Sequence, residues 1–131
     1  ITYKKLKKMA TLKLTSTLTS TDLTSDSISS IVAKSATVTQ GGITRDNITA
    51  VVGAPLTLIP HANHAAGSYV YFKNAGTLNL SIKIGAGAAT IFEIYLIPGT
   101  WGMFPWTADT NDISVYASGA TGCLLEYGVF E

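Results

Sequence analysis

Charge is scarce in this chain. Only 17 of its 131 residues, or 13%, are Asp, Glu, Lys or Arg, whereas a soluble globular domain usually has about 25%. So few charged groups leave little to keep a broad exposed surface in solution. This composition is less suited to an isolated enzyme than to a protein that is covered by neighbours in an assembly, and we expect such neighbours here.

Cysteine and long apolar runs are also scarce. Cys123 is the single cysteine, so no disulfide can form within the chain. No apolar run approaches the roughly 18 residues of a membrane helix, and no apolar stretch of signal-peptide length follows the basic start. Helical spacing with capping residues is missing as well. The single cysteine excludes a disulfide scaffold, and from the other absences we expect no membrane helix and no secretory signal.

The basic residues are gathered at the start of the chain. The first eight residues hold four of the nine basic groups, while the chain from Met9 onward has five basic and eight acidic residues. Nucleic-acid-binding domains carry a basic patch or stripe. The body of the chain has no such excess, and we expect no nucleic-acid partner.

Alternation of apolar residues with Ser, Thr and Gly dominates what is present. This period of two is typical of half-buried β-strands, and residues 77–84 show it most clearly, with Leu78, Leu80, Ile82 and Ile84 on one face. Eight or nine such segments follow one another at roughly 8–12-residue spacing. We therefore predict an all-β fold, a single antiparallel β-sandwich of the jelly-roll or another Greek-key type.

The N-terminal segment is predicted to be an extended arm. Residues 15–30 contain eleven Ser or Thr, and alternation places Leu12, Leu14 and Leu18 on one face of a strand. We assign residues 1–30 to this arm with its first strand and residues 31–131 to the sandwich. The arm is expected to add as a strand to a neighbouring subunit, with the three leucines in the interface.

Three polar motifs suggest metal or phosphate binding, and a simpler interpretation is favoured for each. His61-x-x-His64 has metal-ligand spacing but lacks a third and fourth ligand. Residues 109–112 resemble a calcium loop without its glycine and distal glutamate, and residues 85–90 lack the lysine and helix of a phosphate loop. We interpret all three as loops or turns and predict no metal and no cofactor.

Catalytic residues are not predicted either. The sequence has no recognisable Ser-His-Asp arrangement, and Cys123 lies on the inward face of the last predicted strand. Glu93 and Glu126 could form a carboxylate pair on adjacent strands, but a cross-strand pairing of Glu93 with Lys83 or Lys73 is the simpler interpretation. We therefore do not expect an enzyme.

Aromatic residues are concentrated in the C-terminal half. A sandwich core accommodates about five of them, and the surplus can stack on sugar rings or anchor a protein interface. The low charge favours an interface, with Trp101, Phe104 and Trp106 as its anchors. The aromatic residues after residue 60 are Tyr69, Tyr71, Phe72, Phe92, Tyr95, Trp101, Phe104, Trp106, Tyr116, Tyr127 and Phe130.

Several segments together resemble small all-β structural proteins of tailed bacteriophages. They are LIPGTWGMFPW at residues 96–106, DISVYA at 112–117, LEYGVFE at 125–131, MATLKLTS at 9–16 and YVYFKN at 69–74. The resemblance covers most of residues 9–131. It implies a virion component, such as a capsid decoration protein, a head fibre or a tail component, and it brings no catalytic residues with it.

We therefore expect a non-enzymatic virion protein that decorates the capsid exterior. It would bind the major capsid protein or other virion proteins as a homo-oligomer, with a trimer preferred, and would have no membrane partner. One alternative is a tail component or carbohydrate-binding module for host recognition, in which Trp101, Trp106 or Tyr95 stacks on sugars. A glycan-active enzyme is the other, and it would need a carboxylate pair in a cleft.

Overall fold

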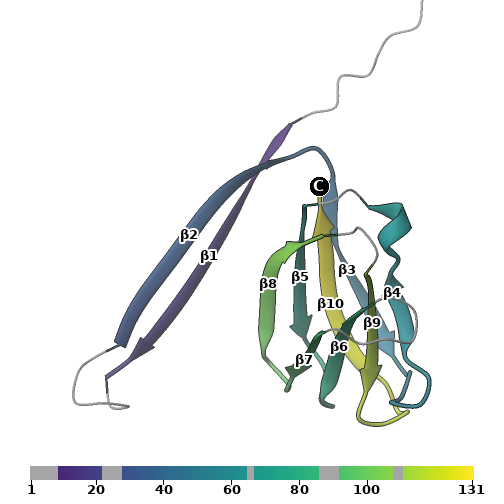
Figure 1. Cartoon of the computed structure of the whole chain (residues 1–131). Coiled ribbons are helices and arrows are strands. Elements are labelled where there is room, and N and C mark those ends of the chain that lie inside the picture. Colours follow the sequence, from purple (N-terminus) through teal and green to yellow (C-terminus); the bar gives the residue numbers. More distant parts are fainter. Residues whose placement is uncertain (1–8, 22–27, 65–66, 86–91, 108–110) are drawn as a thin grey trace, which may run out of the picture. The chain divides into compact units, whose positions relative to one another are not determined.

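The computed structural model describes residues 9–21, 28–64, 67–85, 92–107 and 111–131. In these segments nearly all regular structure is β, as Figure 1 shows. No helix within them is long and apolar enough to cross a membrane. Backbone contacts divide the chain into two compact units, Ile1–Gln40 and Gly41–Glu131.

The first unit, which we call the arm, is a two-stranded hairpin. Strands β1 (Ala10–Ser20) and β2 (Ile28–Val38) pair antiparallel in unbroken register, from Ala10 opposite Val38 to Ser20 opposite Ile28. The predicted boundary after residue 30 lies inside β2, and the two units divide after Gln40. The strand continues past residue 30 because its residues keep pairing with β1.

The second unit is a sandwich of two four-stranded antiparallel sheets. Sheet 1 has the order β3-β10-β5-β8 and sheet 2 the order β4-β9-β6-β7. The elements are β3 (Gly41–Ile48), β4 (Leu56–Ile59), the short 3-10 helix η1 (His61–Asn63), β5 (Ser68–Asn74), β6 (Leu80–Gly85), β7 (Phe92–Leu96), β8 (Trp101–Trp106), β9 (Asp112–Ala117) and β10 (Cys123–Phe130).

The connectivity of the sandwich is that of a jelly roll. Strand β3 pairs with β10, β4 with β9, β5 with β8 and β6 with β7. The chain thus forms one long hairpin whose successive strand pairs alternate between the two sheets, which is the double-sheet arrangement of jelly rolls. The predicted all-β sandwich is confirmed, and of the two predicted types the jelly roll is the one present.

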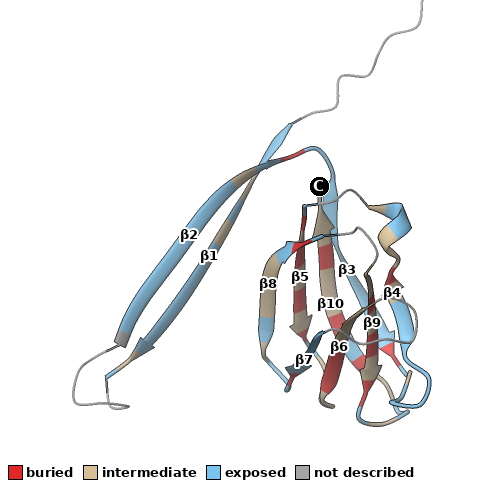
Figure 2. Cartoon of the chain, in the orientation of Figure 1, coloured by how far each residue is buried: buried red, intermediate tan, exposed pale blue. Residues whose placement is uncertain are grey.

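The core lies between the sheets, and Figure 2 shows buried residues alternating with half-buried ones along β5. Phe72, Leu80 and Leu125 are each at most 1% exposed. Leu80 and Ile82 are buried as their alternation predicts, while Leu78 and Ile84 pack against the core from its margin. Burial of apolar side chains from both inner faces is the main stabilising contribution in such a sandwich.

Asn74 links the two sheets at the end of β5, and its side chain is fully buried. Its Nδ2 donates to the carbonyl oxygens of Leu78 (2.7 Å) and Leu96 (2.9 Å). Its Oδ1 accepts from the Gly76 N–H (3.0 Å) and the Cys123 thiol (3.3 Å). One amide therefore connects β5 and β10 of sheet 1 with β7 and the approach to β6 of sheet 2.

Candidate functional site

The outer face of sheet 1 carries several exposed apolar residues. Alternation turns Phe72 and Leu125 into the core, so their neighbours along β5 and β10 face outward. Ile43 is 53% exposed, Trp101 46% and Leu124 37%. An apolar surface of this kind is typical of a protein interface. We call this surface the sheet 1 face, and its apolar members are Ile43, Tyr69, Tyr71, Trp101, Met103, Pro105, Leu124 and Phe130.

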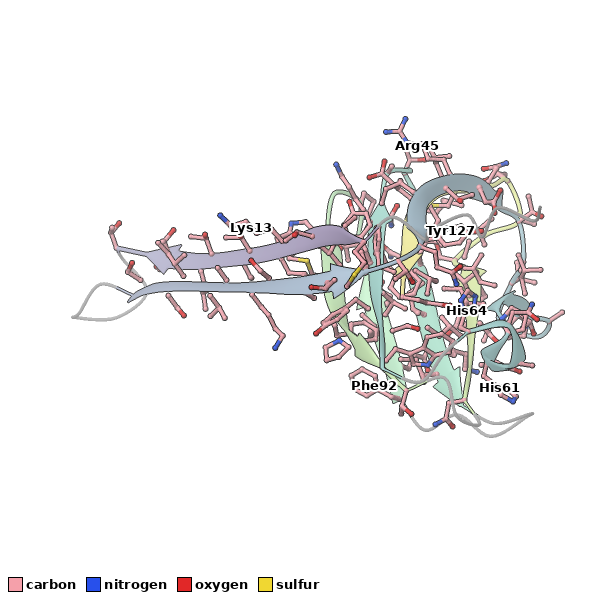
Figure 3. The ribbon with its side chains drawn as sticks, turned by 90° about the horizontal axis from the view of Figure 1, so that it is seen from above. Lys13, Arg45, His61, His64, Phe92 and Tyr127 are labelled. Carbon is pink, nitrogen blue, oxygen red and sulfur yellow. The ribbon has the colours of Figure 1, made fainter. Side chains whose placement is uncertain are left out.

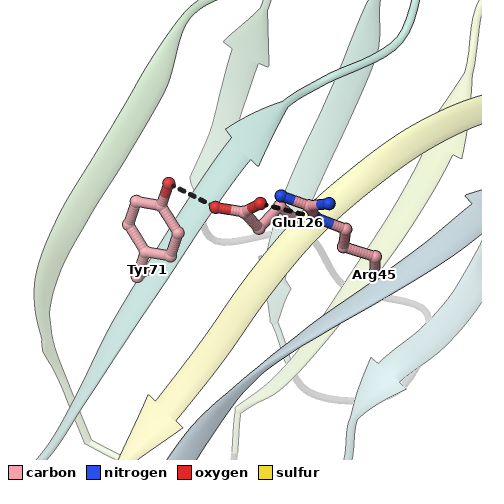
Figure 4. Close-up of polar contacts among 3 residues, drawn as sticks. All are labelled: Arg45, Tyr71 and Glu126. Atoms are coloured by element: carbon pink, nitrogen blue, oxygen red, sulfur yellow. Dashed lines mark hydrogen bonds and ion pairs between the residues drawn. The ribbon is translucent and has the colours of Figure 1, made fainter.

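A polar network crosses the sheet 1 face (Figure 4). Arg45 of β3 donates from Nε to Glu126 Oε2 at 2.8 Å, and the Tyr71 hydroxyl donates to Glu126 Oε1 at 3.0 Å. The bond from Arg45 and then that from Tyr71 hold the pKa of Glu126 below its usual value. Burial, followed by the bond to Glu126, raises the pKa of Tyr71. Both oxygens of the Glu126 carboxylate thus accept a hydrogen bond, so we assign Glu126 a structural role on the sheet 1 face.

The three predicted interface anchors of β8 do not share a face. Trp101 lies on the sheet 1 face opposite Lys73. Phe104 packs against the core with its ring 6.1 Å from that of Phe72, and Trp106 is only 4% exposed. Trp106, predicted as an interface or sugar-stacking residue, is therefore placed in the core, because its position on β8 points it inward. Residues an odd number apart on a strand face opposite sides, and this parity separates Trp101 from the other two in the sequence itself.

On the arm, the three predicted leucines lie on one face of the hairpin. Leu12 and Leu14 are half-buried and Leu18 is 66% exposed. The register places Ala36, Lys34 and Ser30 opposite them, and Val32 on the same face is 63% exposed. We call this surface the arm face.

A groove of about 400 Å³ lies between β3 and β4, the edge strands of the two sheets. Tyr127 lines it and donates its hydroxyl to Asp46 Oδ2 at 2.9 Å. Burial, with the bond to Asp46 as the next cause, raises the pKa of Tyr127 to about 12. The other lining residues are Gly42, Ile43, Thr44, Leu58, Ile59, Pro60, Asn63, His64, Gly128 and Val129.

Replacement of Tyr127 by Phe should change the response of the sandwich to alkali. A phenol whose pKa is raised on folding stabilises the protein fully below its unfolded value of 10, and this contribution is lost as the pH rises toward about 12. We expect the free energy of unfolding, measured in urea at several pH values, to fall less steeply between pH 10 and 12 in Tyr127→Phe than in the natural chain. Equal slopes would show that this phenol is not shifted, and Asp46→Asn should give an intermediate slope.

The two histidines hold separate carboxylates. His61 Nδ1 lies 2.5 Å from Asp112 Oδ1, and the His61 backbone N–H donates to the same oxygen at 2.8 Å. These contacts lower the pKa of Asp112, with the backbone hydrogen bond as the larger cause. His64 Nδ1 lies 2.5 Å from Glu131 Oε1. The pairs fasten the η1 loop to β9 and to the end of β10, a role that the spacing of the histidines in sequence did not indicate.

In the described segments, no three His, Cys, Asp or Glu side chains are grouped to hold a metal ion. The calcium-like motif at 109–112 lies outside the described residues except for its last two positions, and the glycine motif at 85–90 lies outside them except for Gly85.

Glu93 and Glu126, considered as a carboxylate pair, lie on different sheets. Glu93 stands on β7 directly opposite Lys83 and accepts from the Tyr116 hydroxyl at 2.7 Å. Glu126 faces outward from sheet 1. Because each points away from the core on its own sheet, the sandwich separates them and they cannot act on one bond.

No protein family model matches this chain, and no curated protein matches it in sequence.

Proposed function

We propose that this chain is a non-enzymatic structural protein of a virion. It decorates the capsid exterior by binding the major capsid protein as a homo-oligomer, with a trimer preferred. The observation that carries the proposal is the arm face, where Leu18 and Val32 are more than 60% exposed on a two-stranded sheet. A protein with a separate core in its sandwich has no need of such an arm for its own stability.

An isolated two-stranded hairpin is marginally stable in water, and ordering its backbone costs about 1–2 kcal/mol per residue. Burial of apolar surface against a neighbour offsets that cost by about 25 cal/mol per Å². The arm face is therefore suited to lie on another protein. The described part of the arm has Lys13 and Lys34 as its charged residues, so an acidic or neutral apolar surface would accept it best.

The fold and the composition support the same proposal. Jelly rolls are used by viral capsid proteins and by lectins, although a fold by itself does not define a function. The sheet 1 face supplies a second apolar surface with its one carboxylate already neutralised by Arg45. Low charge over the whole chain suits a protein that is covered on more than one side.

The number of copies in intact particles tests this proposal. We expect quantitative mass spectrometry of purified particles to find hundreds of copies, and a density map to place them on the outside of the shell. A handful of copies at one vertex would instead favour a tail component. Absence of the chain from purified particles would overturn the proposal.

A carbohydrate-binding role in host recognition is the second candidate. It rests on Trp101, whose ring is 46% exposed on the sheet 1 face, because exposed aromatic rings can stack on sugars. Tyr95, the other exposed candidate, is 63% exposed but lies on the outer face of sheet 2, so the two rings do not form one platform. Glycan-array binding that is lost in Trp101→Ala and kept in Tyr95→Ala would favour this candidate.

A further inference from the structure

The four edge strands of the sandwich differ in how they resist pairing with other chains. Natural edge strands are protected by charges, prolines, bulges or short length. Strand β3 carries the exposed pair Arg45 and Asp46, and the four-residue β4 has a register shift between Thr57 and Ile59. Strand β8 contains Pro105, which has no N–H. Strand β7 has no proline and no basic residue, and its five residues pair with β6 without a shift.

The outer edge of β7 also carries exposed aromatic residues. Phe92, labelled in Figure 3, is 56% exposed and Tyr95 is 63% exposed. Glu93 is the only charged residue of the strand. In the described part of sheet 2, β7 has β6 on one side and no strand on the other. Such an edge is suited to accept a further strand through backbone hydrogen bonds.

We propose that β7 pairs antiparallel with β7 of a second copy, about a two-fold axis at Ile94. This register places Phe92 opposite Leu96 of the second copy and Glu93 opposite Tyr95 of the second copy. Each contact occurs twice, as a two-fold interface requires. Sheet 2 of one copy and sheet 2 of the other then join into one continuous eight-stranded sheet.

The chemistry of the strand is complementary to itself in this register. Glu93 accepts the Tyr116 hydroxyl through Oε1, and its Oε2 receives no hydrogen bond from the described residues. The hydroxyl of Tyr95 in the second copy can donate to that oxygen. On the other face of the strand, the 56% exposed Phe92 comes to lie beside Leu96 of the second copy, which is already buried in its own core, so the apolar area gained there is that of Phe92. An axis at Glu93 would instead place two carboxylates opposite each other, which is destabilising.

The arm of a second copy is the competing occupant of this edge. Its charged residues in the described segments, Lys13 and Lys34, would also complement Glu93. The two occupants respond oppositely to an added acid at position 95. Tyr95→Glu would repel Glu93 of a second β7, whereas it would attract the lysines of an arm.

Sedimentation of the purified full-length chain over a range of concentrations tests the pairing. This proposal rests on the homo-oligomer part of the proposed function and gives it a two-fold contact, which by itself makes a dimer in place of the preferred trimer. It is measured without particles, so the two can fail separately. We expect a dimer contact that Tyr95→Glu weakens about tenfold or more, through two like-charge contacts and two lost hydrogen bonds. The triple variant Lys83→Glu/Glu93→Lys/Tyr95→Glu should restore it, because it keeps opposite charges at the Lys83–Glu93 pair of β6 and β7 and creates opposite charges across the proposed contact. Thr57→Glu on the opposite edge of sheet 2 should leave it unchanged.

Each outcome decides the proposal. A natural chain that stays monomeric at all concentrations overturns it, as does a trimer whose mass does not respond to Tyr95→Glu. Stronger association of Tyr95→Glu, or a folded triple variant that stays dissociated, also overturns it. Because a variant can fail to fold, hydrogen exchange of the natural chain provides a second measurement. The amides of residues 92–96 should become more protected as concentration rises, and exchange that is independent of concentration overturns the proposal.

Discussion

Asn74→Ala should lower the free energy of unfolding of the sandwich by roughly 3–5 kcal/mol. The substitution leaves the carbonyl oxygen of Leu96 and the N–H of Gly76 without their side-chain partner, and it leaves the Leu78 carbonyl oxygen with the weak Cys123 thiol donor alone. The Asn74 side chain that makes these bonds is fully buried. Each buried group that loses its hydrogen bond costs about 1–3 kcal/mol. Urea unfolding followed by tryptophan fluorescence measures the loss.

Two further variants show whether hydrogen bonding is the cause. Asn74→Asp keeps the shape of the side chain but presents an oxygen to two carbonyl oxygens, so it should be at least as damaging as Asn74→Ala. Asn79→Ala should cost little, because the hydrogen bonds of Asn79 with the described residues involve only its backbone. If Asn74→Ala cost less than about 1 kcal/mol, the amide would not be the link between the sheets that its contacts indicate.

Removal of residues 1–40 should abolish binding to particles and leave the sandwich folded. The cut falls where the two compact units divide, and the core residues all belong to the second unit. A shorter deletion, from residue 1 to a point within residues 22–27, would remove β1 and leave β2 without its partner strand. Co-sedimentation with particles measures binding, and circular dichroism with thermal melting measures the fold.

Point variants test the same claim in the full-length chain. Leu18→Glu places an acidic group on the arm face and should lower particle occupancy about tenfold or more, since a buried charge is costly without a partner and is repelled by an acidic surface. Thr19→Glu places the same charge on the opposite face and should have little effect. If particles were still fully occupied after removal of the arm, the docking surface would lie in the region of Trp101 and not on the arm. If the shortened chain failed to fold, the sandwich would depend on the arm.

Much of the fold could be predicted because the two sides of each strand have different surroundings. On β5 and β9 the buried and half-buried residues alternate strictly, so the pattern in the sequence is visible. On β8 the pattern is hidden, since Trp101 and Met103 face outward while Phe104 and Trp106 face inward. Apolar residues on both faces erase the alternation, and only parity could have separated Trp101 from Trp106.

The contacts of the candidate site were beyond prediction because they join distant parts of the chain. Arg45 and Glu126 are 81 residues apart, and His61 and Asp112 are 51 apart. Local spacing is the only evidence that a single sequence offers about such residues. It placed His61 and His64 in one motif, while the jelly-roll connectivity assigns each to a different carboxylate.

The pairing of β3 with β10 also sets the order in which the chain can fold during synthesis. The arm hairpin is local and can close once residue 38 has left the ribosome, whereas β3 gains its partner only when residues 123–130 have been made. Pairings between distant segments form slowly. The newly made chain therefore presents Leu18 and Val32 while its sandwich is still incomplete. Newly synthesised copies are in this way exposed to association through their arms before each has a finished core.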